Sequence, residues 1–545
     1  MKTPQLQQHS PSSATEAACR FQRLVEHLKN PALYDHFAKQ ISVLETHIST
    51  VLLVGDYAYK LKKPYNLGFL DFTTLEARHY YCEEELRLNR RLAPNLYMSV
   101  VAITGSVDAP HFDGKGKIIE YAVKMRRFPQ ENLLLNVLQR GELHVEQLDR
   151  LAQRIATFHA ALPAAVPNQD FGEPDSLHAA TRQNFTQIAP LIFSAVDRAQ
   201  LDRLAQLSED LFARTLPIFL QRKQQGFIRE CHGDLHLGNM VLIDGEIAPF
   251  DCIEFNVSFR WNDVMSEIAF VVMDLASRGR PDLGFHFLNS YLEQTGDFSG
   301  LQVLRYYLMF RAVVRAKIAA ILASEADIPS DKGVAAWQDF HHYLDLAVQF
   351  SHTPPFLLVL MHGPSGSGKS TVARDLATQL SAIHARSDVE RKRLYGFSPL
   401  AHTDAQPNTG IYTQEATQRT YARLMEITLD AQSAGYAVVL DATFLSTKQR
   451  APFLALSDNT WIVSCEAPEE VLRNRVRSRY QAGTDAAEAN LAVLEQQLAM
   501  REGLSEIEMQ RTTLLNTQQP FDVHNLSAQL LQKNMAKLPQ IRRPC

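Results

Sequence analysis

The chain has little cysteine, no long apolar run and no large excess of either charge. Its six cysteines among 545 residues are too sparse for a disulfide scaffold, and no Cys-x-x-Cys pair suggests a zinc site. No stretch approaches about 18 consecutive apolar residues, the length that a membrane-spanning helix needs. The first twenty residues are polar and lack the apolar core of a secretory signal. We therefore expect a cytoplasmic protein without a membrane partner.

The charge balance is also unremarkable for a soluble protein. Fifty-five Lys and Arg face 60 Asp and Glu, which gives a net charge of -5 and no reason to expect a protein that coats nucleic acid. The sequence is 46% hydrophobic and 21% charged, as ordinary globular proteins are, so wholesale disorder is excluded. At about 150 residues per domain, a chain of this length has room for three or four compact units.

One boundary stands out. Pro354-Pro355 cannot continue a helix, and the apolar run FLLVLM at 356–361 that follows is typical of a buried parallel strand. We therefore predict a linker over 350–355. The expected organisation is a flexible tail over 1–25, a first domain over 26–349 and a second domain over 356–545. Because each side has enough apolar sequence for a core, we expect the two halves to fold separately.

The first half begins with strand patterns and then turns helical. Residues 51–54 and 57–63 flank Gly55-Asp56, which predicts a hairpin. A helix is expected from about residue 74, with Thr73 and Glu76 as a capping box, and a strand over 118–123. From 148 to 346 the pattern is mainly helical, interrupted by a strand-rich segment at 228–251.

The second half carries a phosphate-binding motif. GPSGSGKST at 363–371 satisfies G-x-x-x-x-G-K-[ST], with a strand pattern before it and a helix pattern after it. Backbone N–H groups of such a loop surround phosphate oxygens, while Lys369 reaches the outer phosphates and Ser370 holds Mg²⁺. The predicted nucleotide-binding residues are Gly363, Ser365, Gly366, Ser367, Gly368, Lys369, Ser370 and Thr371.

Two carboxylates follow this motif at the ends of expected strands. Asp441 ends the strand pattern at 436–440, where a carboxylate can organise Mg²⁺, or it caps the next element. Asp388 follows a possible strand at 381–385 and could deprotonate an acceptor hydroxyl, with Arg391 holding an acceptor anion. Asp388 could equally cap the helix that it precedes.

An arginine-rich segment, VLRNRVRSR, comes later in the second half. Arg475 and Arg479 are four residues apart and so share a helix face, where they could neutralise a transferring phosphoryl group. A solvated helix face is the alternative. Together with GPSGSGKST, RSDVERKR and VVLDATF, this segment resembles P-loop small-molecule and polynucleotide 5′-hydroxyl kinases over about 356–535. The resemblance implies that Asp388 is the acceptor-side base and that Arg475 and Arg479 are lid arginines.

The first half has a second informative stretch, HGDLHLGN. Asp234 and Asn239 are spaced as in the H-R-D-x-x-x-x-N loop of protein kinases, where the Asp accepts the acceptor proton and the Asn ligates Mg²⁺. Asp244-Gly245 then predicts a hairpin that delivers Asp251, a second metal-binding carboxylate. We interpret Asp263 as a structural acid that holds this loop.

These residues resemble the aminoglycoside phosphotransferase and choline-kinase-like branch of the protein-kinase fold, over about 40–345. The resemblance implies an ATP-anchoring lysine and a helix glutamate. Lys60 is preferred, although Lys62 points to the same strand face, and Glu85 is preferred over the neighbouring Glu84. The sequence departs from protein kinases in having no G-x-G-x-x-G before the hairpin, so another loop must cover the phosphates.

The whole chain resembles a bacterial family that fuses an aminoglycoside phosphotransferase-like domain to a P-loop kinase domain. The expected fold is an α+β protein-kinase-like bilobal domain followed by an α/β P-loop domain with a mainly parallel sheet. We predict a bifunctional ATP-dependent phosphotransferase that uses ATP and Mg²⁺ and acts on hydroxyl groups of small molecules. The alternatives are a nucleotide-dependent regulatory switch and a nucleic-acid 5′-hydroxyl kinase, the latter disfavoured by the lack of basic and aromatic platforms near the P-loop.

Overall fold

The computed structural model describes residues 11–37, 39–68, 70–166, 169–325, 330–401, 403, 409–482 and 485–536. These residues form two compact units. The first unit is Met1–Gln147, Phe158–Gly172 and Lys223–Glu267, and the second is Leu148–Thr157, Glu173–Arg222 and Ile268–Cys545. This division does not follow the predicted linker, because the second unit joins the P-loop part to most of the helices that precede residue 350.

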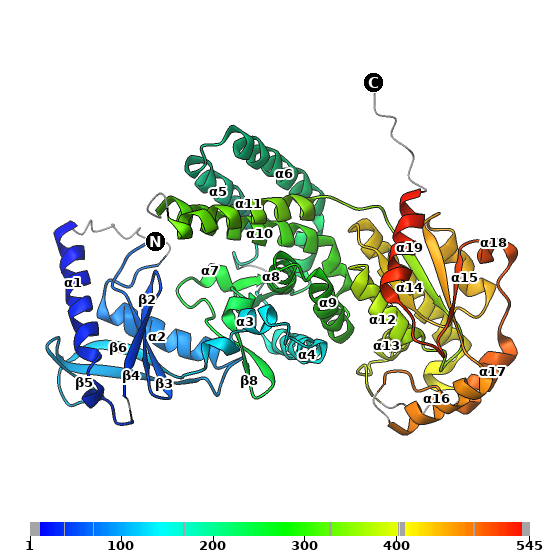
Figure 1. Cartoon of the computed structure of the whole chain (residues 1–545), viewed down its shortest axis with the longest axis horizontal. Helices are drawn as coiled ribbons and strands as arrows, with labels where there is room; N and C mark the ends of the chain where they lie inside the picture. The colour runs from blue at the N-terminus through cyan, green and yellow to red at the C-terminus, as the bar shows by residue number, and fades with distance from the viewer. Residues whose placement is uncertain are drawn as a thin grey trace. The chain divides into compact units, whose positions relative to one another are not determined.

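The first unit contains a six-stranded antiparallel sheet in the order β1-β2-β3-β6-β4-β5 (Figure 1). The predicted hairpin is present, with Gly55-Asp56 connecting two of the strands and Gly55 in the left-handed region at φ 56°. The strand bounds are Ile41–Glu45 for β1, Ser49–Val54 for β2, Tyr57–Lys62 for β3, Tyr97–Ser106 for β4, Ala109–Phe112 for β5 and Ile118–Arg126 for β6.

A helix precedes this sheet where we expect a flexible tail. Helix α1 spans Pro11–Leu28, so the prediction of a tail is wrong for residues 11–25, while residues 1–10 lie outside the described part. The reason is an apolar stripe at i, i+3, i+4 and i+7 that packs in one core cluster with residues of β2, β3 and β4. The stripe consists of Phe21, Leu24, Val25 and Leu28.

Helix α2, Leu75–Asn89, packs against β6 and β4. Its first turn is capped by Thr74, whose hydroxyl accepts a hydrogen bond from Ala77 N at 3.1 Å, and Thr73 donates to Asp71 instead. The helix therefore begins where we expect, but the capping residue is the next one along the chain.

The rest of the first unit carries short elements around the HGDLHLGN segment. The predicted hairpin at Asp244-Gly245 is confirmed, since both residues have a positive φ and join two antiparallel strands. The bounds within the first unit are Leu134–Gln139 for α3, Ile228–Glu230 for β7, Met240–Ile243 for β8, Glu246–Pro249 for β9, Val257–Arg260 for α7 and Trp261–Asp263 for β10. Two helices are shared between the units: α4, Val145–Ala161, has residues 148–157 in the second unit, and α8, Val264–Ser277, has residues 268–277 there. Short 3-10 turns span Pro31–Leu33, Gln130–Asn132 and Leu237–Asn239.

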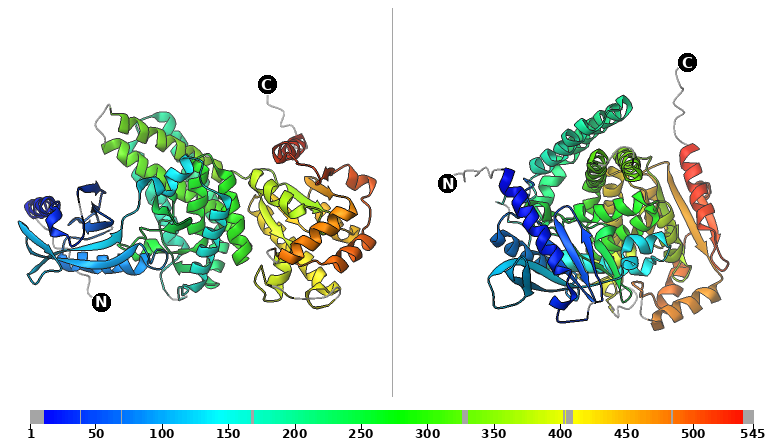
Figure 2. Two further views of the ribbon diagram at one scale, coloured as in Figure 1. Left: turned by 60° about the horizontal axis from the view of Figure 1, so that its bottom comes forward. Right: turned by 60° about the vertical axis from the view of Figure 1, so that its left-hand side comes forward.

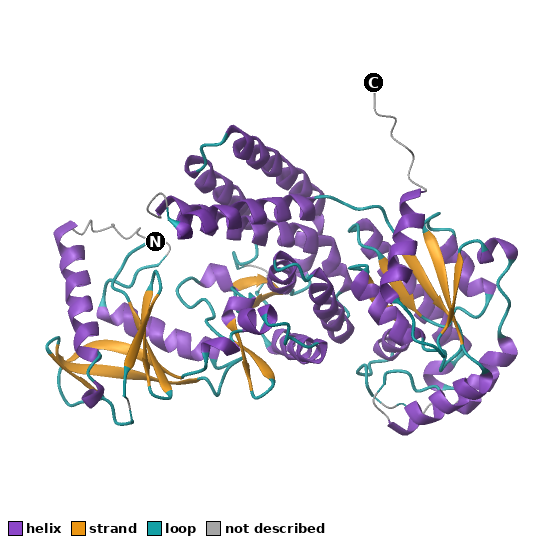
Figure 3. Cartoon of the chain, viewed as in Figure 1, coloured by secondary structure: helices purple, strands orange, loops and turns teal. Residues whose placement is uncertain are grey.

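The second unit begins with helices. Among them α10 and α11 pack side by side over most of their length (Figure 3). The bounds are Pro174–Ile188 for α5, Ala195–Gln224 for α6, Pro281–Thr295 for α9, Leu301–Glu325 for α10 and Asp331–Ser351 for α11. Two 3-10 turns lie between them, Ala189–Leu191 and Phe298–Gly300.

The second unit also holds a five-stranded, fully parallel sheet in the order β12-β13-β11-β14-β15, with helices packed around it (Figure 2). The strands are β11 Leu358–His362, β12 Ile383–Arg386, β13 Val438–Asp441, β14 Thr460–Glu466 and β15 Thr512–Asn516. The helices are α12 Lys369–Gln379, α13 Ser387–Leu394, α14 Gln414–Ser433, α15 Thr447–Leu454, α16 Glu469–Ala482, α17 Leu491–Met500, α18 Glu506–Met509 and α19 Val523–Ala536, with a 3-10 turn at Gly410–Tyr412.

Both faces of the parallel sheet are buried. Val359 and Met361 of β11 share one core cluster with residues of α12 and α19. Leu358 and Leu360 are also fully buried, and because side chains alternate along a strand they face the other side. Helix α14 contacts β13, and helix α15 contacts β14. A sheet that is covered on both faces requires strands that are apolar on both faces, which explains why the apolar run before the P-loop predicts this strand.

Two side chains tie the parallel-sheet region to the helices before it. The Asn289 carboxamide of α9 donates to Ala382 O and accepts from His384 N, both at 2.9 Å. Arg305 of α10 donates to the carbonyl oxygens of Ala434 at 3.1 Å and Gly435 at 2.9 Å. The Arg305 guanidinium also donates to two carbonyls at the end of α11, those of Phe350 at 3.1 Å and His352 at 2.5 Å.

Within the described part of the chain, no helix combines the length and the apolar character that a bilayer crossing demands.

Candidate active sites

The two predicted lysines of β3 lie in one cluster of buried ion pairs in the first unit. Lys60 Nζ lies 2.8 Å from Glu85 Oε1 and donates to Asp251 Oδ1 at 2.5 Å. Lys62 Nζ donates to Glu85 Oε2 at 2.8 Å and also to Glu254. Both lysines therefore reach Glu85 of α2, but Lys60 is the one that contacts Asp251, and sequence reasoning did not single out Glu254.

Lys60 and Glu85 hold each other ionised, whereas burial raises the pKa of Glu254. Burial lowers the pKa of Lys60, but the carboxylates of Asp251 and Glu85 outweigh it and raise that pKa well above its ordinary value. Burial raises the pKa of Glu85, yet the two lysines bring it down to about 2. Lys62 is fully buried while the Lys60 side chain keeps 12% of its surface exposed, so Lys60 is the cation that a bound anion can reach.

The HGDLHLGN loop places Asp234 and Asn239 together. Asn239 Nδ2 donates to Asp234 Oδ2 at 2.9 Å, an orientation that leaves the carboxamide oxygen for a cation. Phe250 N donates to Asn239 O at 2.9 Å, and the His232 ring bonds Phe250 O at the same distance. The loop is thus fastened directly to the residue before Asp251.

Asp251 has an unusual backbone. Its φ is 62°, in the left-handed region that non-glycine residues seldom adopt, and its N–H donates to the Tyr97 hydroxyl at 3.1 Å. Its side chain keeps 43% of its surface exposed. Strained residues of this kind persist where the surroundings fix a side chain for a task, and here the strain turns a carboxylate toward Lys60.

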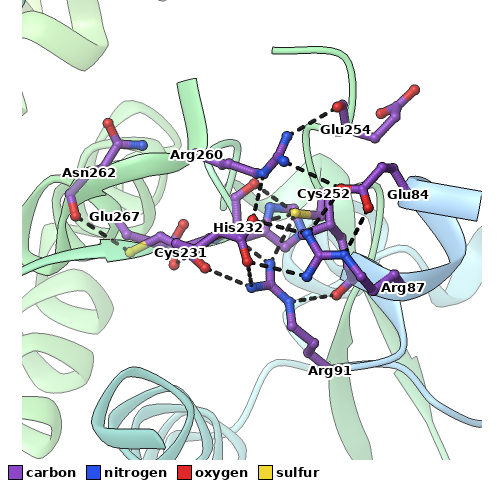
Figure 4. A network of polar contacts seen from close by, with 12 residues as sticks. Glu84, Arg87, Arg91, Cys231, His232, Cys252, Glu254, Arg260, Asn262 and Glu267 are labelled. Atoms are coloured by element: carbon purple, nitrogen blue, oxygen red, sulfur yellow. Dashed lines mark hydrogen bonds and ion pairs between the residues drawn. The ribbon is translucent and has the colours of Figure 1, made fainter. Parts of the chain in front are cut away.

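Glu267 of α8 holds the HGDLHLGN loop and was not singled out from the sequence (Figure 4). Its carboxylate accepts the N–H groups of His232 at 3.1 Å and Gly233 at 2.7 Å, and it pairs with His159 at 2.9 Å. Burial raises the pKa of Glu267, but these partners lower it to about 2. Asp263, to which we assign this role from the sequence, caps α8 by accepting from Met265 N. The acid that is seen to hold the loop therefore lies one helical turn after Asp263.

Arginines complete the network in Figure 4. Arg91 donates to Glu230 O at 2.7 Å and to Cys231 O at 3.1 Å, and Arg260 donates to Glu254 O at 3.1 Å. The backbone on both sides of the loop and of the Asp251 segment is therefore fixed by charged side chains.

The P-loop of the second unit has the geometry that its glycines require. Gly363, Gly366 and Gly368 all have a positive φ, at 137°, 82° and 83°. A Cβ on Gly363 would lie 2.6 Å from Cys465 O, and one on Gly366 would lie 2.8 Å from Leu472 O. Glycine is therefore required at these positions for the loop to curl before the start of α12, where backbone amides can bind a phosphate.

Lys369 and Ser365 are engaged within the protein. Lys369 Nζ donates to Pro364 O at 2.8 Å, and burial lowers its pKa. Ser365 N donates to the side-chain oxygen of Gln497, on α17, at 2.7 Å. Lys369, Ser370 and Thr371 form the first turn of α12.

Asp441 and Asp388 lie at the carboxyl ends of β13 and β12, as predicted. Asp441 is buried, and its Oδ2 lies 3.8 Å from Arg386 Nε. Burial raises the pKa of Asp388, which favours a carboxyl that can hold a proton. Arg391 donates to Ile411 O at 3.0 Å and to Thr417 at 3.2 Å, so it braces the neighbouring loop.

The two candidate lid arginines of α16 have different surroundings. Arg475 donates to Gly366 O at 3.3 Å and to Thr517 O at 2.7 Å, so it supports the P-loop from outside. Two nitrogens of Arg479, Nε and Nη2, are buried and have no hydrogen-bond partner among the described residues. The Arg479 charge lowers the pKa of both Lys369 and Asp388, which places it near them. A guanidinium with two buried, unpaired nitrogens beside a P-loop fits an anionic ligand.

Comparison with known proteins gives a separate family match for the residues of each candidate site. The model of the phosphotransferase enzyme family matches residues 74–307, and the model of an AAA domain matches residues 358–504. Among solved structures, a choline/ethanolamine kinase family protein from Mesorhizobium loti is 11% identical, with a TM-score of 0.36 over 60% of this chain and 99% of that one. A gluconokinase from Sinorhizobium meliloti is 21% identical, with a TM-score of 0.23 over 34% and 94%.

The chain therefore combines a protein-kinase-like phosphotransferase domain with a P-loop kinase domain, as its resemblances imply. Uncharacterized proteins of Mycobacterium tuberculosis and Mycobacterium bovis are each 30% identical to it over 459 residues, which is 83% of this chain and 89% of theirs. The chain belongs to the same family as these mycobacterial proteins.

Proposed function

We propose that the protein is a bifunctional ATP-dependent phosphotransferase whose two sites each phosphorylate a hydroxyl group of a small molecule. The observation that carries the first site is the joint placement of Asp234, Asn239, Asp251 and Lys60 on one set of fastened backbone segments. For the second site it is the P-loop with Lys369 and the unpaired Arg479.

The residues of the first site fit a magnesium–ATP complex. Asn239 Oδ1 and the Asp251 carboxylate are the hard oxygen ligands that Mg²⁺ prefers, and Lys60 offers its charge to phosphate oxygens. Bound Mg²⁺ would supply charge neutralisation at the phosphates. Asp234 would accept the proton of the acceptor hydroxyl, and the hydrogen bond from Asn239 keeps its carboxylate in place.

In the second site Ser370 and Asp441 would hold Mg²⁺, directly or through water, and Asp388 would take the acceptor proton. Lys369 would exchange its bond to Pro364 O for phosphate oxygens. Arg479 would neutralise charge on the transferring group, and Arg475 would position the loop through Gly366.

The test for the first site compares Asp234→Asn with Asp251→Asn, both in a Lys369→Ala background that silences the P-loop. Asp251→Asn removes a charge from a metal site and should weaken both Mg²⁺ and ATP binding. Asp234→Asn should bind ATP normally while phosphoryl transfer, measured first as ATP hydrolysis, falls by roughly 10²–10⁴.

Asp244→Asn is the matched control, because Asp244 lies in the nearby hairpin turn and Asn tolerates its positive φ of 52°. Transfer at the wild-type rate in Asp234→Asn would remove this residue from the mechanism. Nucleotide binding at both sites with no transfer to water or to any hydroxyl compound would favour a regulatory switch.

A further inference from the structure

A cavity of about 340 Å³ lies within the second unit, beside the start of α12. Its wall comes from α4, α9, α12 and β12 together with Asp485, and every residue that lines it has a polar or charged side chain. Ser370, the residue after the P-loop lysine, is one of them. Ligand pockets are usually lined mostly by apolar residues, so a wall without an apolar residue is a specific feature.

Most charged groups of the wall are paired with one another, whereas Arg374 of the wall lies 3.9 Å from Asp375, which is not part of it. Asp149 Oδ1 bonds the His286 ring at 2.8 Å and accepts from Ser290 at 2.5 Å. Arg386 pairs with Glu293 at 3.2 Å and with Asp485 at 2.9 Å. A ligand in this cavity therefore lies next to charges that are largely paired. Hydrogen bonds to the surrounding side chains, and not a net charge of one sign, would hold it.

One buried group of the wall has unused hydrogen-bonding capacity. The His384 side chain is only 8% exposed, and its Nε2 has no hydrogen-bond partner among the described residues. The Asp441 carboxylate lies 4.0 Å from it, too far for a hydrogen bond. Because this nitrogen is itself buried, it adds to the polar character of the wall but is not open to a ligand in this arrangement.

Helix α9 presents one face to this cavity. His286, Ser290 and Glu293 are spaced at i, i+4 and i+7, which puts them on the same side of the helix. Asn289, on the same face, bonds the backbone of Ala382 and His384 and so fixes the distance between α9 and β12. The cavity wall is thus built from residues on both sides of the Pro354-Pro355 linker.

We propose that this cavity holds the acceptor of the P-loop site, a polyhydroxylated small molecule such as a sugar or sugar alcohol, and that α4 and α9 supply half of its wall. The inference rests on the proposed phosphoryl transfer at Lys369. A polyhydroxylated compound carries both donors and acceptors around its whole surface, which matches a wall that is polar on every side. An apolar acceptor would leave these groups unpaired.

The position next to Ser370 puts such an acceptor beside the phosphate end of the nucleotide site. In the transfer, the acceptor oxygen forms a bond to the γ-phosphorus, and the bond from that phosphorus to the bridging oxygen breaks with its electron pair leaving on ADP. The hydroxyl proton passes to Asp388, which lies in the first turn of α13, two residues after the wall residue Arg386.

The experiment uses the full chain with Mg²⁺ and a non-hydrolysable ATP analogue. Binding of D-glucitol, D-gluconate and cyclohexanol is followed by saturation-transfer NMR. Gln294→Leu places an apolar side chain in the wall, whereas Gln379→Leu makes the same change at the end of α12, outside the cavity. We expect D-glucitol or D-gluconate to bind, Gln294→Leu to weaken that binding about tenfold, and Gln379→Leu to leave it unchanged.

The proposal is overturned if neither polyhydroxylated probe binds a protein that does bind the ATP analogue, if Gln294→Leu has no effect, or if cyclohexanol binds instead. Analogue affinity and melting temperature in both variants check that the fold is intact. Binding of a polyhydroxylated probe that depends on Gln294, in a protein that binds no ATP analogue, would support the cavity and contradict the proposed function instead.

Discussion

Arg305 predicts that the two halves of the chain do not unfold independently, although the Pro-containing linker alone suggests that they do. The Arg305 side chain is 8% exposed, its guanidinium lies 4.8 Å from the centre of the Tyr436 ring, and it donates to four carbonyl oxygens. Two of those carbonyls belong to the turn before β13 and two to the end of α11. The perturbation is Arg305→Leu, which keeps the packing but removes every donor.

The expected cost follows from the burial of these bonds. The bond to Gly435 O is buried, and an acceptor left unpaired there costs about 2 kcal/mol. The other three are part-buried and can recruit water, so each contributes about 0.7 kcal/mol. The free energy of unfolding of the parallel-sheet region should therefore fall by about 4 kcal/mol.

Two tryptophans allow the halves to be followed separately. Trp337 lies in α11 and Trp461 in β14, and variants that retain one of them report urea unfolding of each region by fluorescence. We expect the two transitions to coincide in the otherwise unchanged protein. In Arg305→Leu the Trp461 transition should move to lower urea and separate from that of Trp337.

Arg477→Leu is the matched control, since Arg477 is exposed on α16. Among the described residues it hydrogen-bonds the Asn474 side chain alone, at 3.3 Å. It should change stability by less than about 0.5 kcal/mol. The reasoning is refuted if the two transitions are already separate without the Arg305 change, or if Arg305→Leu costs no more than the control.

Two further changes test the sites. Glu267→Gln should lower the free energy of unfolding by about 3 kcal/mol at pH 7, because a pKa of about 2 in the folded protein against an ordinary 4.5 stabilises it above pH 4.5. That difference should shrink as the pH falls from 4.5 toward 2, while the exposed Glu146→Gln behaves like the unchanged protein throughout. A gap that does not depend on pH would show that charge is not the cause. Gln497→Ala frees the amide of Ser365, so calorimetry should find ATP-analogue affinity at the P-loop raised about threefold. A weaker affinity would mean that Gln497 itself contacts the nucleotide.

Features set by short sequence patterns could be predicted. The turn at Asp244-Gly245, the P-loop between β11 and α12, and the spacing of Asp234 and Asn239 all depend on residues within one loop. The apolar stripe of α1 was also readable at its i, i+3, i+4 and i+7 positions, but the polar residues before it favoured a tail.

Features that depend on distant partners could not be predicted. The Glu267 carboxylate accepts hydrogen bonds from backbone amides 34 and 35 positions earlier in the chain. Nothing in the local sequence shows that Glu267 has this role and not Asp263, which lies one helical turn before it. Arg305 bonds residues about 130 positions later. Such pairings depend on how whole elements pack, and a single sequence carries no local signal for them.

Asn289 has a consequence for how the parallel sheet meets solvent. Strand β12 is the outermost strand on its side, and an outer strand presents unpaired peptide groups on which a strand of another molecule can grow. The Asn289 carboxamide has the same donor and acceptor as a peptide group. It satisfies the carbonyl of Ala382, just before β12, and the amide of His384 within β12, as a neighbouring strand would. Helix α9 thus acts as a protective cover against sheet-to-sheet assembly, which a fragment beginning after the linker would lack.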